Sequence, residues 1–171
     1  MIPTSPHRVG GIAVLIITII TVLSLIIFVP FAKAQQPFNL MGCGVAATRT
    51  ISECKALTVY NIAGKGSACG SIGDDSFYEL TWEFAILLRA IGGNTAGRGY
   101  YKFTFPDGDY FVLEANDTVL EGGIWNILHG TGKWAGITGR GNGRFVIRGK
   151  PLPIETEQYW FRIYGMLELP R

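Results

Sequence analysis

The stretch Gly130 to Lys133, Gly-Thr-Gly-Lys, has the residue types that come nearest to a phosphate-binding loop. Such a loop requires a glycine five positions before the glycine of its Gly-Lys pair and a serine or threonine after the lysine. Those two positions hold Ile127 and Trp134. A dinucleotide-binding loop would need a helix after its glycines, and glycines recur too often between residues 136 and 149 for a helix to begin there. We therefore exclude nucleotide binding at this segment.

His129 is the only histidine after residue 34. A multi-histidine metal site is thereby excluded, and a Ser-His-Asp arrangement would have to use this residue. His129 precedes a glycine at the expected end of a strand, where active-site residues of barrels often lie. The alternative is a turn histidine exposed to water. We expect no metal and no cofactor.

Three glutamates, Glu79, Glu83 and Glu114, are embedded in expected strands. If such a side chain lines a cavity, burial raises the pKa of the carboxyl group and makes it a proton donor or acceptor for a cyclisation. Large apolar residues alternate with Glu79 and Glu83, which favours solvent exposure of both. Glu114 shares a face with Tyr110 and Val112, so a position facing the cavity is more plausible for Glu114 than for the other two.

Basic residues dominate the chain between Gly122 and Ile154, where no acidic residue occurs. At strand period two, Arg144 and Arg148 share a face, and such a pair can hold a carboxylate or a phosphate bidentately. The alternative is a solvated outer face. The wider charge balance excludes a nucleic-acid partner: without Arg8 and Lys33, the 15 basic residues fall to 13 and equal the 13 acidic residues.

From Leu57 onward, the sequence pattern predicts that short β-strands position these residues. Residues 57–63 are β-branched and aromatic, and residues 77–88 begin with an alternation in which Tyr78, Leu80 and Trp82 point one way. A helix is the alternative for residues 83–91, whose apolar residues also have helical spacing. We prefer a strand because the segment begins with aromatic residues and threonine and ends in Gly-Gly-Asn.

The clearest element is a hairpin over residues 100–114, in which Pro106 presets the φ of a turn and Gly108 accepts a positive φ. Its first strand places Tyr101, Phe103 and Phe105 on one face. Gly92 to Gly99 is expected to be a flexible loop. Further strands are expected at residues 123–128, 137–139, 144–148 and 158–169. Such a series of short strands without a clear long helix predicts a sandwich or a closed barrel, whose bent strands the glycines after Trp134 would suit.

Three motifs between Tyr101 and Phe145 resemble the allene oxide cyclase-like barrels, relatives of the dirigent proteins. They are Phe-Pro-Asp-Gly-Asp, Gly-Gly-Ile-Trp-Asn-Ile and Gly-Thr-Gly-Lys-Trp-Ala-Gly-Ile-Thr-Gly. The resemblance implies an all-β fold, a closed antiparallel barrel of about eight strands around an apolar cavity. It also implies an exported bacterial member, and a homotrimer, since plant members are often trimers. Characterised members are cyclases, or bind a phenoxy radical and direct its coupling. Residues 35–97 do not align with the plant enzymes, so no catalytic role is carried over.

Residues 1–34 differ from the rest, because Ile12 to Phe31 carry no charge and are almost wholly apolar, with Arg8 before them. This pattern predicts a signal peptide cut after Ala32-Lys33-Ala34. The alternative is an uncleaved apolar helix over residues 12–31 that anchors the protein in a membrane, since about 20 apolar residues span a bilayer. In both cases residues 35–171 form the barrel domain outside the cytoplasm, secreted or periplasmic after cleavage and anchored to the membrane without it.

Cys43, Cys54 and Cys69 all lie in the first third of the barrel domain. An oxidising compartment favours a disulfide between two of them and leaves the third free. Cys43 with Cys54, or Cys54 with Cys69, would close a short loop. The sequence does not choose between these pairs.

We expect the domain to bind a small apolar or amphipathic ligand in the barrel cavity, because its aromatic residues exceed what a surface needs and a small barrel can enclose one ligand. One alternative is an isomerase or cyclase acting on a lipophilic substrate. Another is a structural or envelope-associated interaction protein with a packed interior. The candidate ligand-binding residues are Glu114, Tyr110, Tyr101, Phe103, Trp125, His129, Arg144 and Arg148.

Overall fold

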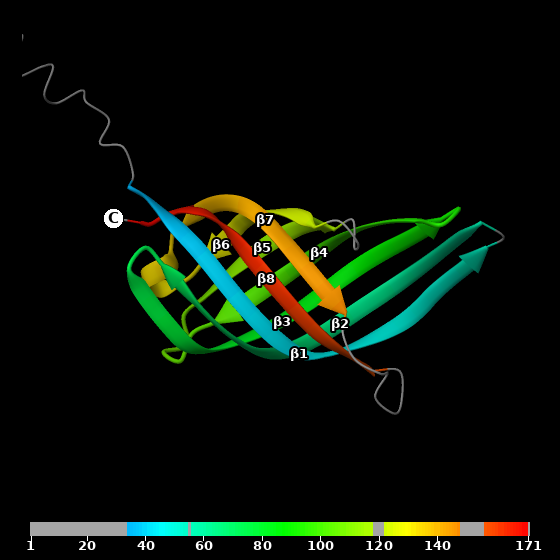
Figure 1. Ribbon diagram of the computed structural model, residues 1–171, viewed down its shortest axis with the longest axis horizontal. Coiled ribbons are helices and arrows are strands. Elements are labelled where there is room, and N and C mark those ends of the chain that lie inside the picture. Colours follow the sequence, from blue (N-terminus) through cyan, green and yellow to red (C-terminus); the bar gives the residue numbers. More distant parts are fainter. Residues whose placement is uncertain (1–33, 55, 118–121, 148–155, 171) are drawn as a thin grey trace, which may run out of the picture. The chain divides into compact units, whose positions relative to one another are not determined.

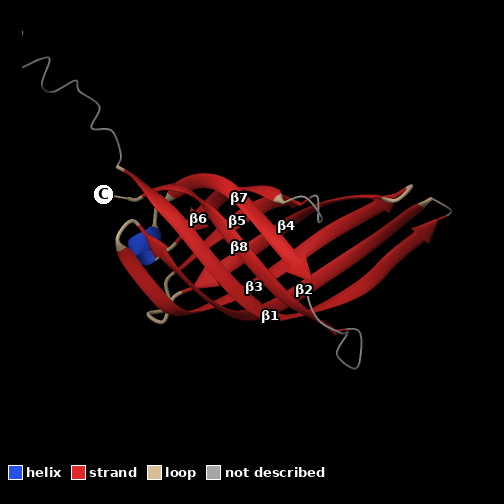
Figure 2. Ribbon diagram, viewed as in Figure 1, coloured by secondary structure: helices blue, strands red, loops and turns tan. Residues whose placement is uncertain are grey.

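The computed structural model describes residues 34–54, 56–117, 122–147 and 156–170. These residues form eight strands and one short 3₁₀ helix, η1 (Gly132–Trp134). The strands are β1 (Gln35–Cys54), β2 (Leu57–Ile72), β3 (Asp75–Ile91), β4 (Asn94–Thr104), β5 (Tyr110–Asp117), β6 (Gly123–Gly130), β7 (Thr138–Ile147) and β8 (Thr156–Glu168). They form a closed antiparallel barrel (Figures 1 and 2), so the barrel expected from the sequence is confirmed and the sandwich is excluded.

The barrel closes because its first and last strands pair. β1 pairs with β2 along one edge and with β8 along the other, so that Leu40 lies opposite both Gly70 and Ile163. In Figure 1 the blue start of β1 runs beside the red β8. A closed sheet has no unpaired edge, and the backbone N–H and C=O groups that an open sheet would expose are therefore paired within the barrel.

The interior is filled by apolar side chains from β1 to β6 and from β8. Along β3, the even-numbered residues from Leu80 to Leu88 are buried and the odd-numbered residues between them are exposed. This alternation confirms the strand and excludes the helix considered for residues 83–91, because a helix with that spacing would have buried Leu87 and Ile91, which are exposed. The barrel wall therefore has an inner apolar face and an outer exposed face along β3.

A β-bulge in β3 reverses the alternation at its beginning. Tyr78 and Glu79 lie together opposite the single residue Cys69 of β2, and Glu79 has a φ of 65°. An extra residue moves the preceding side chains to the other face of the sheet. Tyr78 is accordingly 70% exposed, so the expectation that it shares a face with Leu80 is wrong.

Tight turns join the strands on both sides of β4. Gly92 and Gly93 have φ values of 56° and 86°, as a two-residue hairpin turn with both central residues at positive φ requires. β4 begins at once with Asn94, so the flexible loop expected over residues 92–99 is wrong. The turn after β4 is as expected, with Gly108 at a φ of 89° and its N–H donating to the carbonyl of Phe105 at 2.9 Å.

Two glycines let β7 and β8 bend over a buried tryptophan. Gly141 and Gly165 lie opposite each other in the register, with the indole of Trp125 beneath them. A Cβ at Gly165 would lie 2.7 Å from both the Cα of Gly141 and Cζ2 of Trp125, closer than real Cβ atoms come. The absence of side chains at this point is what the barrel wall requires, in agreement with the expectation from the glycine-rich sequence.

The three cysteines are free thiols exposed to solvent. Cys43 and Cys54 belong to the same extended strand, which at about 3.3 Å per residue separates their Cα atoms by roughly 36 Å. Cys69 lies opposite Met41, which is two residues further from Cys54 along β1 than Cys43 is, so Cys69 is still more distant from Cys54. Both disulfide pairs considered from the sequence are wrong for this fold, because a disulfide needs Cα atoms within about 7 Å.

Residues 1–33 lie outside the described residues, so the signal peptide and the apolar helix over residues 12–31 stay predictions. Among the residues that the structure does describe, none belongs to a helix with the length and apolar composition of a membrane span.

Candidate functional site

Three of the expected ligand-binding residues lie in the barrel interior, where they pack against other aromatic rings. Tyr101 stacks on Phe84 with ring centroids 5.4 Å apart, and Phe103 lies 5.3 Å from Phe111. Trp125 is fully buried, and its indole Nε1 donates to the carbonyl of Asn142 at 3.0 Å. These side chains pack against one another in the interior, where the sequence interpretation expected a cavity. Packed side chains are one of the two known fillings of a small barrel.

Glu114, Tyr110 and His129 lie on the outer face of the wall instead. The carboxylate oxygen Oε1 of Glu114 lies 3.4 Å from Nε of Arg98, and the Glu114 side chain is 20% exposed. Glu114 therefore does not have the cavity-facing position considered for it. The buried residues of β5 are Phe111, Leu113 and Ala115, and strand alternation therefore turns Glu114 outward. The ring of Tyr110 meets the imidazole of His129 edge to face at 5.9 Å.

The structure describes only one arginine of the expected Arg144–Arg148 pair. Arg144 is exposed on β7 opposite Arg162 of β8, and Arg148 lies outside the described residues.

Glu79 and Glu83 are both exposed, as expected. No carboxylate is buried among the residues whose side chains the structure describes, and no group of three or more metal-ligating residues occurs among them.

The glycine-lysine segment caps one end of the barrel. Thr131 joins it to the start of β5, since its hydroxyl accepts from the N–H of Tyr110 at 3.0 Å and its own N–H donates to the Tyr110 carbonyl at 2.9 Å. Trp134 stacks on the buried ring of Phe105 with centroids 4.7 Å apart. The segment is therefore an anchored turn over the core, which explains its composition without a phosphate.

The backbone and the side chain of Lys133 are both held within this cap. The backbone N–H of Lys133 donates to the carboxylate of Asp109 at 3.0 Å. Its ammonium group lies 2.6 Å from the carboxylate of Asp107 and 5.1 Å from the ring centre of Phe105. The hydrogen bond from Lys133 holds the pKa of Asp107 below its ordinary value of 3.8. Because the pKa is lowered in the folded state, the ionised carboxylate stabilises the fold above that value, and this contribution is lost as the pH falls and the carboxyl group is protonated.

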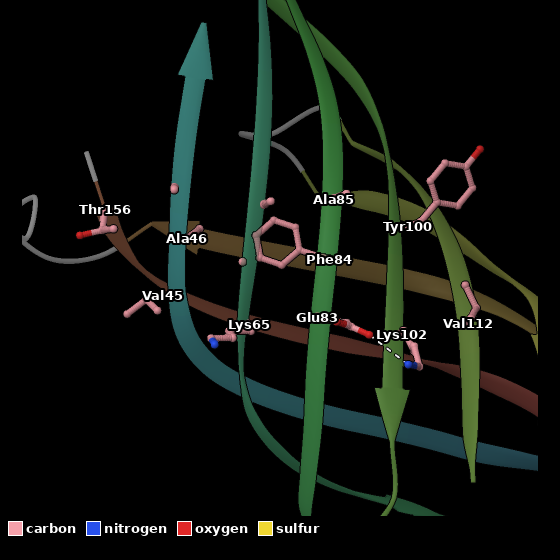
Figure 3. A pocket seen from close by; sticks show the side chains of 13 residues that line it. Val45, Ala46, Lys65, Glu83, Phe84, Ala85, Tyr100, Lys102, Val112 and Thr156 are labelled. Carbon is pink, nitrogen blue, oxygen red and sulfur yellow. Dashed lines mark hydrogen bonds and ion pairs between the residues drawn. The ribbon is translucent and has the colours of Figure 1, made fainter. Parts of the chain in front are cut away.

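A groove of about 580 Å³ lies on the outer wall across β1 to β5. Its floor consists of three exposed alanines that lie side by side in the register: Ala47 of β1 is opposite Ala63 of β2, which is opposite Ala85 of β3. Because an alanine side chain ends at Cβ, three in a row leave a hollow between the larger side chains on either side. Figure 3 shows the groove and the residues that line it.

The next row of the register supplies the charged rim of the groove. Val45, Lys65, Glu83 and Lys102 follow one another across β1 to β4. Lys102 is paired with Glu83 at 3.0 Å, as the dashed line in Figure 3 shows, whereas Lys65 has no ion pair with any described residue. Tyr100 lies opposite Ala85 and is about half exposed. The groove thus combines an apolar floor, an aromatic side and a positive charge that has no ion-pair partner among the described residues.

None of the expected ligand-binding residues that the structure describes lines this groove. Its three alanines belong to three different strands, and only the registers β1–β2 and β2–β3 bring them together. Single alanines in a strand carry no signal of a site, which is why sequence reasoning missed them. One residue of the charged rim, Glu83, was identified from the sequence as an exposed strand residue.

These features define the molecule as a closed eight-stranded antiparallel barrel with an aromatic interior and a grooved outer wall. Among solved structures, that of the pterocarpan synthase dirigent protein GePTS1 is similar to this chain, with a TM-score of 0.47 and 11% identity over 81% of this chain and 93% of that chain. At this level the likeness carries no argument about this chain. No protein-family model and no curated protein matches the sequence.

Proposed function

We propose that the barrel binds a small amphipathic molecule in the groove of its outer wall, and not in its interior. The observation that carries the proposal is the row Ala47–Ala63–Ala85, which leaves about 580 Å³ open on the wall. This volume falls within the roughly 300 to 1,000 Å³ of small-molecule sites. Aromatic rings occupy the interior, whose own contacts a ligand would have to displace.

The rim specifies the chemistry of the ligand. Two lysines and one glutamate leave one positive charge in excess, and the lysine without a described partner, Lys65, borders the alanine floor. A flat apolar molecule with one negative group would bury its body against the alanines and Tyr100 and place its charge beside Lys65.

The groove is tested with two fluorescent naphthalene probes, the anionic 8-anilinonaphthalene-1-sulfonate and the uncharged N-phenyl-1-naphthylamine. Ala63→Trp fills the floor and is expected to weaken saturable binding of both probes by about tenfold or more, which is 1.4 kcal/mol or more. Lys65→Ala is expected to weaken the sulfonate by roughly two- to fivefold, as for an exposed ion pair, and to leave the uncharged probe unaffected.

Ala96→Trp is the matched control, because Ala96 is an exposed alanine on the outer face of β4 that does not line the groove. It is expected to bind both probes like the unaltered protein. Equal binding by the proteins with tryptophan at position 63 and at position 96 would place the probes elsewhere and refute the outer groove as the site.

A structural or interaction role is the second candidate, and it is favoured by large apolar side chains exposed on neighbouring strands. Met41 of β1 and Trp160, Tyr164 and Met166 of β8 are each at least 40% exposed. The homotrimer expected from the sequence would cover such a surface. A cyclase is favoured less, because proton transfer to a buried substrate needs an ionisable group inside, and no described carboxylate is buried.

We also propose that the barrel works outside the cytoplasm, as the apolar segment Ile12 to Phe31 and the site Ala32-Lys33-Ala34 indicate. The expected result is a protein that starts at Gln35 when it is purified from its own host and its N-terminal sequence is determined. A chain that keeps residues 1–34 and sediments with membranes would favour the anchor. A full-length chain in the cytosolic fraction would contradict export.

A further inference from the structure

A second hollow, of about 820 Å³, lies on the outer wall across β6, β7 and β8 and reaches the start of β1. It shares no lining residue with the alanine-floored groove. Three of its lining positions, Gly139, Gly141 and Gly165, have no side chain. Two of them, Gly141 and Gly165, are the glycines that let the wall bend over Trp125, so they leave backbone exposed at the bottom of this hollow.

Polar side chains without partners in the described part of the chain surround these glycines. Asn126 of β6 lies opposite Arg140 of β7, and both side chains are exposed. Asn142 follows on the same face of β7, and its side chain is exposed as well. None of the three side chains makes a hydrogen bond or ion pair with another described residue, so their donors and acceptors are available to a ligand.

A carboxylate is held in place at the other end of the hollow. Glu168 of β8 accepts from the hydroxyl of Thr138 at 3.1 Å and from the side-chain amide of Gln35 at 3.2 Å. The contacts come from β7 and β1, on either side of β8, and fix the position of the carboxylate before any ligand arrives. Thr138, Gln35 and Glu168 all line the hollow.

Apolar side chains stand beside these polar groups. In the register, Asn142 lies between Ile124 of β6, which is 60% exposed, and Tyr164 of β8, which is 51% exposed. Met166 lies opposite Arg140 and is also exposed. A tyrosine ring offers a flat apolar face together with a hydroxyl at its edge.

We infer that this hollow, which we call the polar saddle (Gln35, Asn126, Thr138, Arg140, Asn142 and Glu168), is a binding site for a neutral saccharide. A sugar carries closely spaced hydroxyl groups that both donate and accept, and it also carries apolar C–H faces. Arg140 supplies donors only, Glu168 supplies acceptors, and Asn126 and Asn142 supply both. The exposed tyrosine and isoleucine provide the surface for the C–H face.

The balance of charge is what separates a neutral sugar from an anion. Arg140 and Glu168 lie two register positions apart on the same face, and the formal charges of the six residues of the polar saddle sum to zero. A phosphate or a uronic acid would gain from the arginine and be repelled by the glutamate. A neutral polyol uses both groups and meets no such conflict.

The test is isothermal titration of the full-length protein with four neutral hexasaccharides: cellohexaose, maltohexaose, laminarihexaose and chitohexaose. Binding of at least one is expected, and Arg140→Ala combined with Asn126→Ala is expected to weaken it by about tenfold or more, because hydrogen bonds to a charged group and to an amide are both lost. Tyr164→Ala is expected to weaken the same sugar.

Arg89→Ala is the matched control, since Arg89 is an exposed arginine on the outer face of β3, away from the polar saddle. It should bind the sugar unchanged, and thermal melting should show that all variants are folded. The inference is overturned if none of the four sugars binds at millimolar concentration, or if the Arg140–Asn126 double variant binds as well as the control. Binding of tetragalacturonate in place of the neutral sugars, lost with Arg140, would overturn it too. The naphthalene probes bind a separate groove, so failure of either proposal is seen independently of the other.

Discussion

Replacing Trp125 with alanine is expected to lower the free energy of unfolding by about 3 to 5 kcal/mol, the largest effect of any single substitution considered for this protein. The side chain is fully buried, lies 5.5 Å from Phe38 between ring centroids, and donates its indole N–H to Asn142. Alanine would leave a cavity beneath Gly141 and Gly165, where no side chain is present to fill it. Urea unfolding followed by far-ultraviolet circular dichroism measures the change.

Ile124→Ala is the control for this measurement. Ile124 is the neighbour of Trp125 in β6 and is 60% exposed, so its truncation is expected to change stability by no more than about 0.5 kcal/mol. Similar losses from both substitutions would mean that β6 does not present Trp125 to the interior, and the described alternation of the wall would be wrong.

Gly132→Ala is expected to destabilise the protein by about 2 to 4 kcal/mol and to loosen the cap formed by η1. Two causes add. Gly132 has a φ of 50°, where residues with a side chain are strained, and an added Cβ would overlap the carboxylate of Asp109. Displacing that carboxylate breaks its hydrogen bond with the N–H of Lys133. Thermal melting and near-ultraviolet circular dichroism, which reports on the packing of Trp134, measure the two effects.

Gly92→Ala separates the two causes, because Gly92 has a φ of 56° and open space around its Cβ position. It is expected to show only the backbone strain, about 1 to 2 kcal/mol. Equal melting temperatures for the two variants would refute the role of Asp109. ATP is expected to leave the melting of every variant unchanged. If ATP stabilised the unaltered protein but not the Gly132→Ala variant, the phosphate-loop interpretation would be restored.

Local features of the sequence predicted several elements well. The turn Pro106-Asp107-Gly108 and the buried face of Tyr101, Phe103 and Phe105 are as expected, because a proline and a glycine at those places limit the backbone to few conformations. The rejection of a phosphate loop also rested on local spacing alone, and the structure gives the segment another role as the cap of the barrel.

Features that depend on a neighbouring strand were missed. β1, which spans Gln35–Cys54, was not among the expected strands, since small residues such as Gly42, Gly44 and Ala47 on it give no clear alternation. Its pairing with β2 and β8 makes it a strand. The outward turn of Tyr78 was likewise invisible, because the bulge that causes it is defined by the register of β3 against β2.

The amino-acid sequence by itself determined that this protein is built from strands, that a turn joins two of them at residues 106–108, and that the spacing around Gly132 does not match a phosphate loop. Turn chemistry and side-chain period act within a few residues, so they are readable from the chain. Only the tertiary structure decided that the interior is packed with rings and that Ala47, Ala63 and Ala85 meet on the outside. The reason is that a strand's period says which residues share a face, whereas closure and register decide which face is inside and which residues of different strands become neighbours.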